Sequence, residues 1–397
     1  MTTKIYLIRH AEAEGNLYRR SQGQYNSNVT PLGRVQLGAL AERFRDEPLD
    51  ALWSSDLNRT RSTAAAILKY HPELQLRLSP RLREIDVGVW EDRPWGNIAA
   101  DYPEQMELFT HDPARWSVPG GEPYEEVAAR MRTAVLDIAA RHPGGTAAVV
   151  THGLAIRSLL CHILGVPSER IDSVPYGDNT SVSLVTVEED GRLSAVWYND
   201  ASHLQARGLS TFSRQSWWRD EVRQKPAAKV YARFLPLDPG KEGELYTHVY
   251  AETWRASHGN IDGFAPAVYL RTALAHAERD PRCVMKLYAG DDFAGVIELD
   301  PDRGGDIGVG WISLLYIAPA RRKRRLGIQL IGHAISYFRR EGRTALRLHV
   351  SETNENAIGF YTAAGFVPVG KTQGVGGALL LMEADIRPRV LTPEEII

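Results

Sequence analysis

The stretch IYLIRHAE, residues 5–12, decides the fold of the first half of the chain, because an apolar run ends there on an arginine and a histidine. Much later AAVV, residues 147–150, runs in the same way into Thr151, His152 and Gly153. Such runs predict buried strands, and the carboxyl ends of parallel strands meet at the edge of an open sheet where α/β proteins bind ligands. Two imidazoles at two strand ends, with arginines between them in the sequence, indicate a site for phosphate chemistry.

Size and composition limit the class of protein. The chain has 397 residues, 43% of them hydrophobic and 24% charged, with a formal net charge of -2. The length favours two or three domains, and the charge gives no reason to expect nucleic acid or an anionic membrane as a partner. Cys161 and Cys283 are too few for a disulfide framework and are expected to be buried thiols. Without a secretory signal pattern or an apolar stretch of ~20 residues, we expect a cytoplasmic protein.

The first half alternates strands with helices. Thr30 and Pro31 form a helix-start signal, and Asp190-Gly191 is a hairpin signal between two alternating segments. The expected strands are 4–9, 50–54, 75–78, 146–151, 181–188 and 193–199, and the expected helices are 31–46, 57–70, 122–142 and 154–164, with loops and short helices over 84–121. This order predicts an α/β fold in which a mainly parallel sheet carries helices on both faces.

The rhythm breaks over residues 200–228, where we expect a boundary and where Trp217 and Trp218 are interpreted as interdomain packing. The prediction is a first domain over 1–205, a linker over 206–228 and a second domain over 229–397. The second domain is expected to hold strands at 229–236, 283–300, 309–318 and 345–351, helices at 240–256, 264–278, 326–341 and 354–364, and a final pair of strands.

A series of matches in the first domain follows a fixed order. The series begins with Arg9-His10-Ala11-Glu12. Single residues, pairs and short runs then follow along the chain: Asn16, Gln22-Gly23, Thr30, Gly33, Ser54–Leu57, Arg59, Thr63-Ala64, Leu82–Glu84, Gly88, Trp90-Glu91, Gly120–Glu122 and His152-Gly153. This series resembles the histidine phosphatase superfamily, which includes cofactor-dependent phosphoglycerate mutases and small-molecule phosphatases. The resemblance covers about residues 1–205 and implies a three-layer α/β/α fold similar to phosphoglycerate mutase.

The residue types fit metal-independent phosphoryl transfer. A neutral imidazole at His10 can attack phosphorus and form a phosphohistidine, while the planar forks of Arg9 and Arg59 match phosphate oxygens. His152 can donate a further hydrogen bond, and Glu84 can protonate the leaving oxygen and then activate water. The resemblance implies these five catalytic roles, and it also implies that Asn16, Gln22, Gly23 and Gly153 bind the substrate.

Some alternatives stay open in this domain. Asp86 could be the acid instead of Glu84, and the domain could be a mutase, which must keep its phosphoenzyme away from water. The short segment from Glu84 to Gly120 favours hydrolysis. Two residues depart from the family pattern: Ala11 stands where glycine is frequent, and Pro123 stands where serine is frequent.

The second domain contains a strand, a proline, a basic turn and an apolar helix over residues 312–331, followed by an Asn354–Ile358 run, Phe360-Tyr361 and Gly365-Phe366. A helix start of this kind suits a pyrophosphate, since backbone N–H groups and the helix dipole both favour an anion. The whole pattern resembles the GCN5-related N-acetyltransferase (GNAT) family over about residues 229–385. The resemblance implies an α+β fold with a mixed, splayed sheet and acetyl-CoA as cofactor, without a metal.

The same resemblance implies individual roles. The backbone near Ile317 would pair with the pantetheine arm, Asn354 would contact the cofactor, and Tyr361 would protonate the departing thiolate. The pyrophosphate loop would consist of Arg322, Lys323, Arg324, Arg325, Leu326 and Gly327. Glu298 is a weaker candidate for the base that receives the proton of the acceptor amine.

Arg325 departs from the family pattern, which has glycine at this position. An arginine fits there if its φ is negative; otherwise the loop could have lost its grip on CoA. The basic run could also be a solvated turn or a nucleic-acid patch, and Tyr361 could be a plain core residue.

The sequence therefore predicts a bifunctional enzyme that hydrolyses a small phosphorylated metabolite and acetylates an amine. The alternatives are a phosphatase with a non-catalytic CoA-binding or scaffold module, and a phosphoglycerate mutase-type phosphotransferase. No nucleic-acid or membrane partner is expected, and a homo-oligomer is left open.

Overall fold

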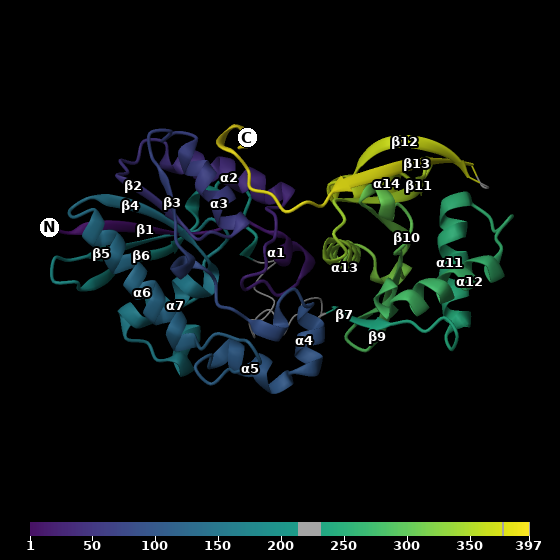
Figure 1. The fold of residues 1–397 in the computed structure, drawn as a ribbon, viewed down its shortest axis with the longest axis horizontal. Coiled ribbons are helices and arrows are strands. Elements are labelled where there is room, and N and C mark those ends of the chain that lie inside the picture. Colours follow the sequence, from purple (N-terminus) through teal and green to yellow (C-terminus); the bar gives the residue numbers. More distant parts are fainter. Residues whose placement is uncertain (213–231, 375–376, 397) are drawn as a thin grey trace. The chain divides into compact units, whose positions relative to one another are not determined.

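The computed structural model describes residues 1–212, 232–374 and 377–396, so the predicted packing of Trp217 and Trp218 lies outside the described residues. The chain divides into two compact units. The first unit comprises Met1–Arg93, Ile98–Lys229 and Pro388–Ile397, and the second comprises Pro94–Asn97 and Val230–Arg387. Each unit is built on its own sheet (Figure 1).

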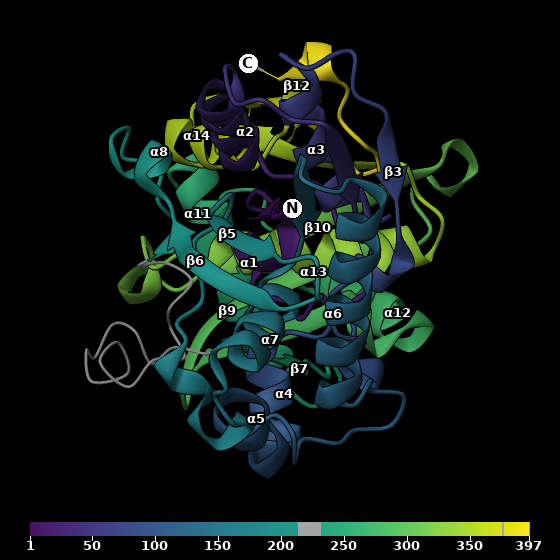
Figure 2. The same ribbon diagram turned by 90° about the vertical axis from the view of Figure 1, so that its left-hand side faces the viewer.

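The first unit contains a six-stranded sheet in the order β3-β2-β4-β1-β5-β6. The pairs β3–β2, β2–β4 and β4–β1 are parallel, and β5 and β6 are antiparallel additions, which confirms the mainly parallel sheet. Helices α2 and α3 cover one face and α6 and α7 cover the other (Figures 1 and 2). The strands are β1 (Thr3–Arg9), β2 (Ala51–Ser54), β3 (Leu76–Leu78), β4 (Thr146–Thr151), β5 (Val182–Val187) and β6 (Leu193–Asp200).

The helices of this half follow their predicted signals. Thr30 caps α2 by accepting the backbone N–H of Gly33 on its side chain, and Pro31 stands at the first helical position. The short helix α1, just after the Arg-His pair, was not predicted. The helices are α1 (Glu14–Tyr18), α2 (Pro31–Phe44), α3 (Asn58–Leu68), α4 (Trp95–Asp101), α5 (Pro103–His111), α6 (Tyr124–Arg141), α7 (Gly153–Leu164) and α8 (Ser202–Gln205), with 3-10 turns η1 (Pro80–Leu82), η2 (Gly88–Trp90) and η3 (Ser168–Ser173).

The register of β1 and β4 positions the site. These strands are neighbours, and Arg9 lies opposite Thr151 in their parallel ladder. Both strands are covered by helices on each face, which explains why they read as continuous apolar runs rather than as alternating ones. The residue after each strand is a histidine, so His10 and His152 emerge together at the carboxyl edge of the sheet.

The second unit contains a seven-stranded mixed sheet in the order β12-β13-β11-β10-β9-β8-β7. Its one parallel pair among the described strands is β10–β11, whose ladder ends at Ile312–Leu348 although β10 continues to Ile317 and β11 to Ser351. The two strands therefore diverge, as the predicted splayed sheet requires. The strands are β7 (Ala232–Pro236), β8 (Val284–Ala289), β9 (Asp292–Asp300), β10 (Val309–Ile317), β11 (Ala345–Ser351), β12 (Val367–Gly374) and β13 (Gly377–Asp385).

The helices of the second unit include α13, which carries the core of this unit. Leu330, Ile331, Ala334 and Phe338 of this helix are all buried, and Phe338 fits against Gly310, where a Cβ would come within 2.3 Å of the ring. The helices are α11 (Gly243–His258), α12 (Pro266–Arg279), α13 (Gly327–Arg340) and α14 (Glu355–Ala363), with 3-10 turns η4 (Pro281–Cys283), η5 (Gly305–Ile307) and η6 (Pro319–Arg321). Cys161 and Cys283 are buried and unbridged, as expected.

Candidate functional site

His10 is held in one orientation by its own backbone and by that of its neighbours. Its backbone N–H donates to the carbonyl of Thr151 at 3.0 Å, and its ring Nδ1 lies 2.7 Å from the carbonyl oxygen of Ala11. Because a carbonyl can only accept, Nδ1 carries the proton and donates to it. The lone pair of a neutral ring is then on Nε2, which is the atom available as a nucleophile.

His152 faces the first ring across a short gap. The two ring centroids are 5.3 Å apart and the ring planes are inclined by 59°. The Nε2 atom of His152 pairs with the hydroxyl of Ser55 at 3.0 Å, and its buried Nδ1 has no hydrogen-bond partner among the described residues. A phosphoryl group bound next to His10 is therefore within reach of a second imidazole.

Two buried arginines accompany the histidines. Arg59, on the first turn of α3, is fully buried and donates from Nη1 to the carbonyl of Tyr25 at 2.8 Å and from Nη2 to that of Gly23 at 2.6 Å. Arg9 donates from Nη1 to the carbonyl of Gly177 at 2.6 Å. Backbone carbonyls fix the planes of both guanidinium groups without neutralising their charge.

The electrostatics of this cluster favour neutral imidazoles. Burial, together with the positive charges of Arg59 and Arg9, holds the pKa of His10 well below its usual value. The pKa of His152 is lowered in the same way, first by burial and then by Arg59 and by His10. Burial lowers the pKa of Arg59 to about 10, so this side chain is still a cation at neutral pH.

Glu84 is placed by the start of α7. Its carboxylate oxygens accept the backbone N–H groups of Leu154 and Ala155, each at 3.0 Å, two and three residues after His152. The charge of Glu84 acts on both Arg9 and Arg59, which places it beside the cation cluster. Asp86, the alternative acid, instead accepts the N–H of Gly88 at 2.9 Å within its own turn.

In the loop after His10, two of the predicted substrate-binding residues make hydrogen bonds to other residues of the same loop. The side-chain oxygen of Asn16 accepts the N–H of Ala13 at 3.0 Å, and that of Gln22 accepts from Gly15 and from the Ser27 hydroxyl. Gly23 has no room for a Cβ, which would lie 2.3 Å from the carbonyl oxygen of Ile85.

Gly153 lies against the guanidinium group of Arg9, with 3.2 Å between its would-be Cβ and Nε of the arginine. Gly153 thus adjoins Arg9 and Gly23 belongs to the loop that holds Arg59, while Asn16 and Gln22 make hydrogen bonds within the loop after His10. Contact of these four residues with a substrate stays a prediction.

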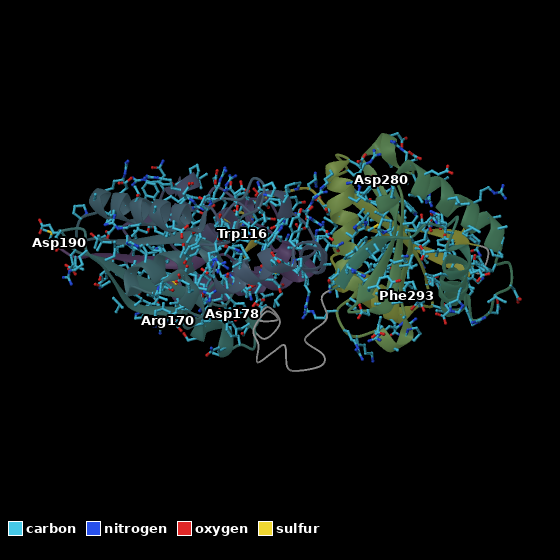
Figure 3. All side chains as sticks on the ribbon, turned by 90° about the horizontal axis from the view of Figure 1, so that it is seen from below. Trp116, Arg170, Asp178, Asp190, Asp280 and Phe293 are labelled. Carbon is cyan, nitrogen blue, oxygen red and sulfur yellow. The ribbon has the colours of Figure 1, made fainter. Side chains whose placement is uncertain are left out.

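Several supporting residues were missed by sequence reasoning. Asn179 donates from its amide to the carbonyl of His10 at 2.9 Å. The charge of Asp178, which Figure 3 labels in the first unit, acts on Arg9. Asp178 and Asn179 lie far along the chain from His10, and no local sequence signal identifies them. Thr63, which the motif series contains without a role, accepts the N–H of Ala11 at 3.0 Å.

Glu91 was noted in the sequence as part of a motif, without a role. Its carboxylate accepts three successive backbone N–H groups, those of Gly23 at 3.2 Å, Gln24 at 2.6 Å and Tyr25 at 3.0 Å. The carbonyls of Gly23 and Tyr25, in the same short loop, hold the Arg59 guanidinium. Glu91 therefore anchors the loop that orients Arg59, and burial raises the pKa of this carboxyl.

In the second unit the structure brings several predicted cofactor residues together. A Cβ at Gly327 would lie 3.1 Å from the ring of Phe360 and 3.7 Å from the side chain of Ile317, so the end of β10, the start of α13 and α14 meet there. The carbonyl of Ile317 accepts from Nε of Arg322 at 3.1 Å. Leu326 precedes α13 as its cap and is buried.

The basic loop differs from the expectation on one point. Arg325 has a φ of +58° and Lys323 a φ of +59°, so the condition of a negative φ at Arg325 is wrong. Arg325 thus has the left-handed backbone conformation that glycine would adopt at no steric cost. For an arginine this conformation costs about 1 kcal/mol. Arg322, Lys323, Arg324 and Arg325 are all exposed just before α13. The donor set still fits a pyrophosphate, because cations and a helix start converge on one loop.

Asn354 and Tyr361 belong to α14. The side-chain oxygen of Asn354 accepts the N–H of Ala357 at 3.1 Å and caps the helix. Tyr361 is buried, packs against Phe360 and Phe366, and has a pKa raised by burial. Its hydroxyl is therefore protonated at neutral pH.

Glu298 is not placed to act as a base for an incoming amine. The side chain is 1% exposed, and its two oxygens accept from the hydroxyl of Tyr246 and from Nδ1 of His276, each at 2.8 Å. Both oxygens are thus occupied inside the core, beneath α11 and α12.

The described residues contain neither a membrane-spanning helix nor a cluster of metal ligands. In residues 1–212, 232–374 and 377–396, no helix is both long and apolar enough to cross a membrane. Within the same ranges, no three His, Cys, Asp or Glu side chains are grouped as metal ligands.

Comparisons with known proteins identify both halves. The sequence profile of the histidine phosphatase superfamily, branch 1, matches residues 5–200, and that of the GNAT acetyltransferase family matches residues 244–366. A protein of Photorhabdus laumondii named probable phosphoglycerate mutase is 32% identical over 215 residues, which are 53% of this chain and 99% of that protein. A protein of the same name from Enterobacter sp. is also 32% identical over 215 residues, with the same coverage.

Solved structures match the same half. Bacillus stearothermophilus YhfR is 31% identical, with a TM-score of 0.49, over 51% of this chain and 99% of that one. A mycobacterial glucosyl-3-phosphoglycerate phosphatase is 27% identical, with a TM-score of 0.47, over 51% of this chain and 100% of that one. On the profile matches and the curated relatives, the chain belongs to the histidine phosphatase superfamily in its first half and carries a GNAT acetyltransferase domain in its second.

Proposed function

We propose that the first domain hydrolyses phosphomonoesters through a phosphohistidine at His10. The observation that carries this proposal is the pair of buried imidazoles, 5.3 Å apart, flanked by the buried guanidinium groups of Arg9 and Arg59. The low pKa of His10 keeps Nε2 unprotonated, as a nucleophile must be.

The proposed reaction has two steps. In the first, Nε2 of His10 forms a bond to phosphorus while the phosphorus–oxygen bond of the ester breaks, and protonated Glu84 gives its proton to the leaving alkoxide. In the second, Glu84 takes a proton from water, whose oxygen attacks phosphorus and releases inorganic phosphate and His10. Arg9, Arg59 and His152 hold the phosphoryl oxygens throughout, and no metal ion is needed for this charge.

The test is the rate of phosphate release from a panel of small phosphomonoesters by the wild type and by His10→Ala. We expect the variant to lose nearly all activity, and wild-type protein given a radiolabelled ester to carry acid-labile label on His10. Equal rates in the two proteins would refute the proposal.

The name of the curated relatives favours a second candidate, a phosphoglycerate mutase. In that reaction the phosphoryl group of His10 returns to the other hydroxyl of the same substrate instead of to water. A phosphoenzyme that survives for minutes, and isomerisation of phosphoglycerate that depends on a bisphosphate primer, would select the mutase. Rapid phosphate release without a primer would select the phosphatase.

We further propose that the second domain transfers an acetyl group to an amine. Acetyl-CoA, the usual cofactor of GNAT domains, supplies the acetyl group as a thioester when it is bound. The backbone of Ile317, where β10 has left β11, would hold the extended arm of the cofactor, and the loop Arg322–Gly327 would hold its pyrophosphate. Tyr361 keeps a proton on its hydroxyl at neutral pH and can give it to the departing sulfur, and the proton that the acceptor amine loses then returns to the tyrosine oxygen.

The left-handed conformation of Arg325 is the observation behind the alternative, a domain that binds CoA without chemistry or only serves as a scaffold. Calorimetric titration of the full chain with acetyl-CoA, followed by an acetylation assay over a panel of amines, separates the three cases. Binding with turnover supports the transferase, binding without turnover a sensor, and no binding a scaffold.

A further inference from the structure

The segment that follows β13 is built into the first unit. Residues 388–396, named the strap below, lie outside both profile matches, which cover 5–200 and 244–366. The strap nevertheless belongs to the compact unit that holds the phosphatase site. In Figure 1 it is the yellow trace that runs beside α2 and α3.

The strap buries two side chains in the core of the phosphatase domain. Leu391 and Ile396 are 4% and 3% exposed, and they join the hydrophobic cluster that contains Leu37 and Phe44 of α2 and Ile67 of α3. Burying two aliphatic side chains of this size stabilises the packed state by several kcal/mol in total, which is enough to hold a short segment in place.

Polar contacts fix the register of the strap. The N–H of Leu391 donates to the Ser62 hydroxyl at 3.0 Å, and the N–H of Arg389 donates to the side-chain oxygen of Asn28 at 2.9 Å. Lys69, the residue that follows α3, donates from Nζ to the carbonyl of Ile396 at 2.8 Å. Within the strap, the N–H of Thr392 donates to Glu395 at 3.0 Å and closes the turn η7 (Pro393–Glu395).

Two of these contacts lead directly to the catalytic cluster. Ser62 lies on α3 one turn after Arg59, next to Thr63, which accepts the N–H of Ala11. Asn28 lies three residues after Tyr25, in the segment whose carbonyls at Gly23 and Tyr25 hold the Arg59 guanidinium, and its N–H donates to Glu14 at 2.9 Å. The strap therefore joins the helix that carries Arg59 to the loop that orients it.

We propose that the strap is a positioning element of the phosphatase site, and that Arg59 is correctly oriented only when residues 388–396 are docked on α3 and on Asn28. This inference rests on the proposed phosphatase function for its kinetic readout. It means that the phosphatase site of this chain depends on residues that follow the acetyltransferase domain.

The test compares the full chain with a chain that ends at Arg387. We expect kcat/KM for p-nitrophenyl phosphate to fall about tenfold or more, since a small displacement of a phosphate-binding group is costly. Inorganic phosphate should inhibit the shortened chain correspondingly less well. Adding a synthetic peptide of residues 388–397 should restore the rate, which a general loss of folding would not allow.

Two variants of the full chain serve as a matched pair if the shortened chain does not fold. Leu391→Ala removes a buried anchor of the strap and should lower kcat/KM while acetyl-CoA binding stays unchanged. Glu394→Ala alters an exposed side chain of the same turn and should leave kcat/KM unchanged. A Leu391→Ala protein with wild-type kcat/KM and wild-type phosphate inhibition would overturn the inference.

Hydrogen exchange separates this inference from the proposed function. Backbone amides of residues 23–28 and 58–63 should exchange faster in Leu391→Ala than in the full chain, whether or not the protein hydrolyses phosphate esters. If the wild type is inactive and Leu391→Ala exchanges faster, the phosphatase proposal is refuted and the positioning role of the strap is supported. If the wild type is active and exchange in Leu391→Ala is unchanged, the phosphatase proposal is supported and the positioning role of the strap is refuted.

Discussion

Buried histidines in the two units of this protein have opposite surroundings. His10 and His152 lie among the cations Arg9 and Arg59, and burial and these charges lower the pKa of both rings. His276 lies between the carboxylates of Glu298, at 2.8 Å, and Asp300, at 3.6 Å. Burial alone would lower the pKa of His276, but the hydrogen bond and charge of Glu298, with the charge of Asp300, outweigh it and raise the pKa.

This difference in neighbouring charge distinguishes the candidate catalytic site of the first unit from the buried ion-pair site of the second. A ring kept neutral beside cations has a free lone pair next to groups that can bind an anion, whereas a ring between carboxylates is stabilised in its charged form. Burial penalises the charged form in both places, so the sign of the net effect is decided by the neighbouring charge. The following predictions test the comparison, beginning with the largest effect.

The largest effect is expected from Arg59→Ala, which removes the main cation beside His10. We expect kcat/KM for a phosphomonoester to fall about 10²–10³-fold, because a fixed charge on the phosphoryl oxygens is lost. Initial-rate kinetics measure the change, and circular dichroism checks that the variant is folded. A loss of less than about fivefold would mean that the cation cluster is not the source of transition-state stabilisation.

The second prediction concerns acid. The native pKa values of His10 and His152 are lowered, so below about pH 6.5 the unfolded chain takes up protons that the native state does not. The free energy of unfolding of the first unit should therefore decrease as the pH is lowered. The two rings together account for up to about 2.7 kcal/mol for each step of one in pH. Urea unfolding at several pH values measures the slope, which should be smaller in His152→Asn by up to about 1.4 kcal/mol per pH unit. An unchanged slope in that variant would contradict the pKa assignment.

A smaller effect is expected from Glu91→Gln. The amide nitrogen of glutamine cannot accept the N–H groups of residues 23–25, so the loop that orients Arg59 should loosen and kcat/KM should fall about tenfold. Asp50→Asn is the matched control, because Asp50 also accepts a backbone N–H, that of Thr146 at 2.8 Å, but at the opposite edge of the sheet. Equal kinetic effects of the two substitutions would remove the role given to Glu91.

The smallest effect is expected from His276 and its neighbours Glu298 and Asp300. The raised pKa of His276 makes its stabilisation complete below about pH 6.5 and lost as pH rises through the native pKa. The second unit should lose less than about 1.4 kcal/mol per pH unit between the unfolded and the native pKa of this ring. Thermal unfolding of wild type and His276→Gln measures it, and the variant should lack this slope. A slope of the opposite sign in the wild type would break the comparison between the two units.

The predicted strands and helices follow from local periodicity, and the structure confirms nearly all of them. The helices α1 and α8 in the first half were not predicted, because five and four residues are too few to show a helical period. At Arg325 the sequence identified the position but not its conformation, because the φ of a non-glycine residue is set by the loop around it.

The sequence by itself determined that two apolar strands each run directly into a histidine, His10 and His152, since apolar runs and their ends are local properties. That these two strands lie side by side is a property of the folded sheet. Only the tertiary structure decided which backbone carbonyls orient Arg9 and Arg59, and that the carboxylate of Glu298 is hydrogen-bonded inside the core. The carbonyls that hold Arg59 lie 34 and 36 residues away, and the strap contacts Asn28 across 361 residues. Such partners are set by packing between distant segments, which leaves no repeating pattern in the chain for sequence reasoning to find.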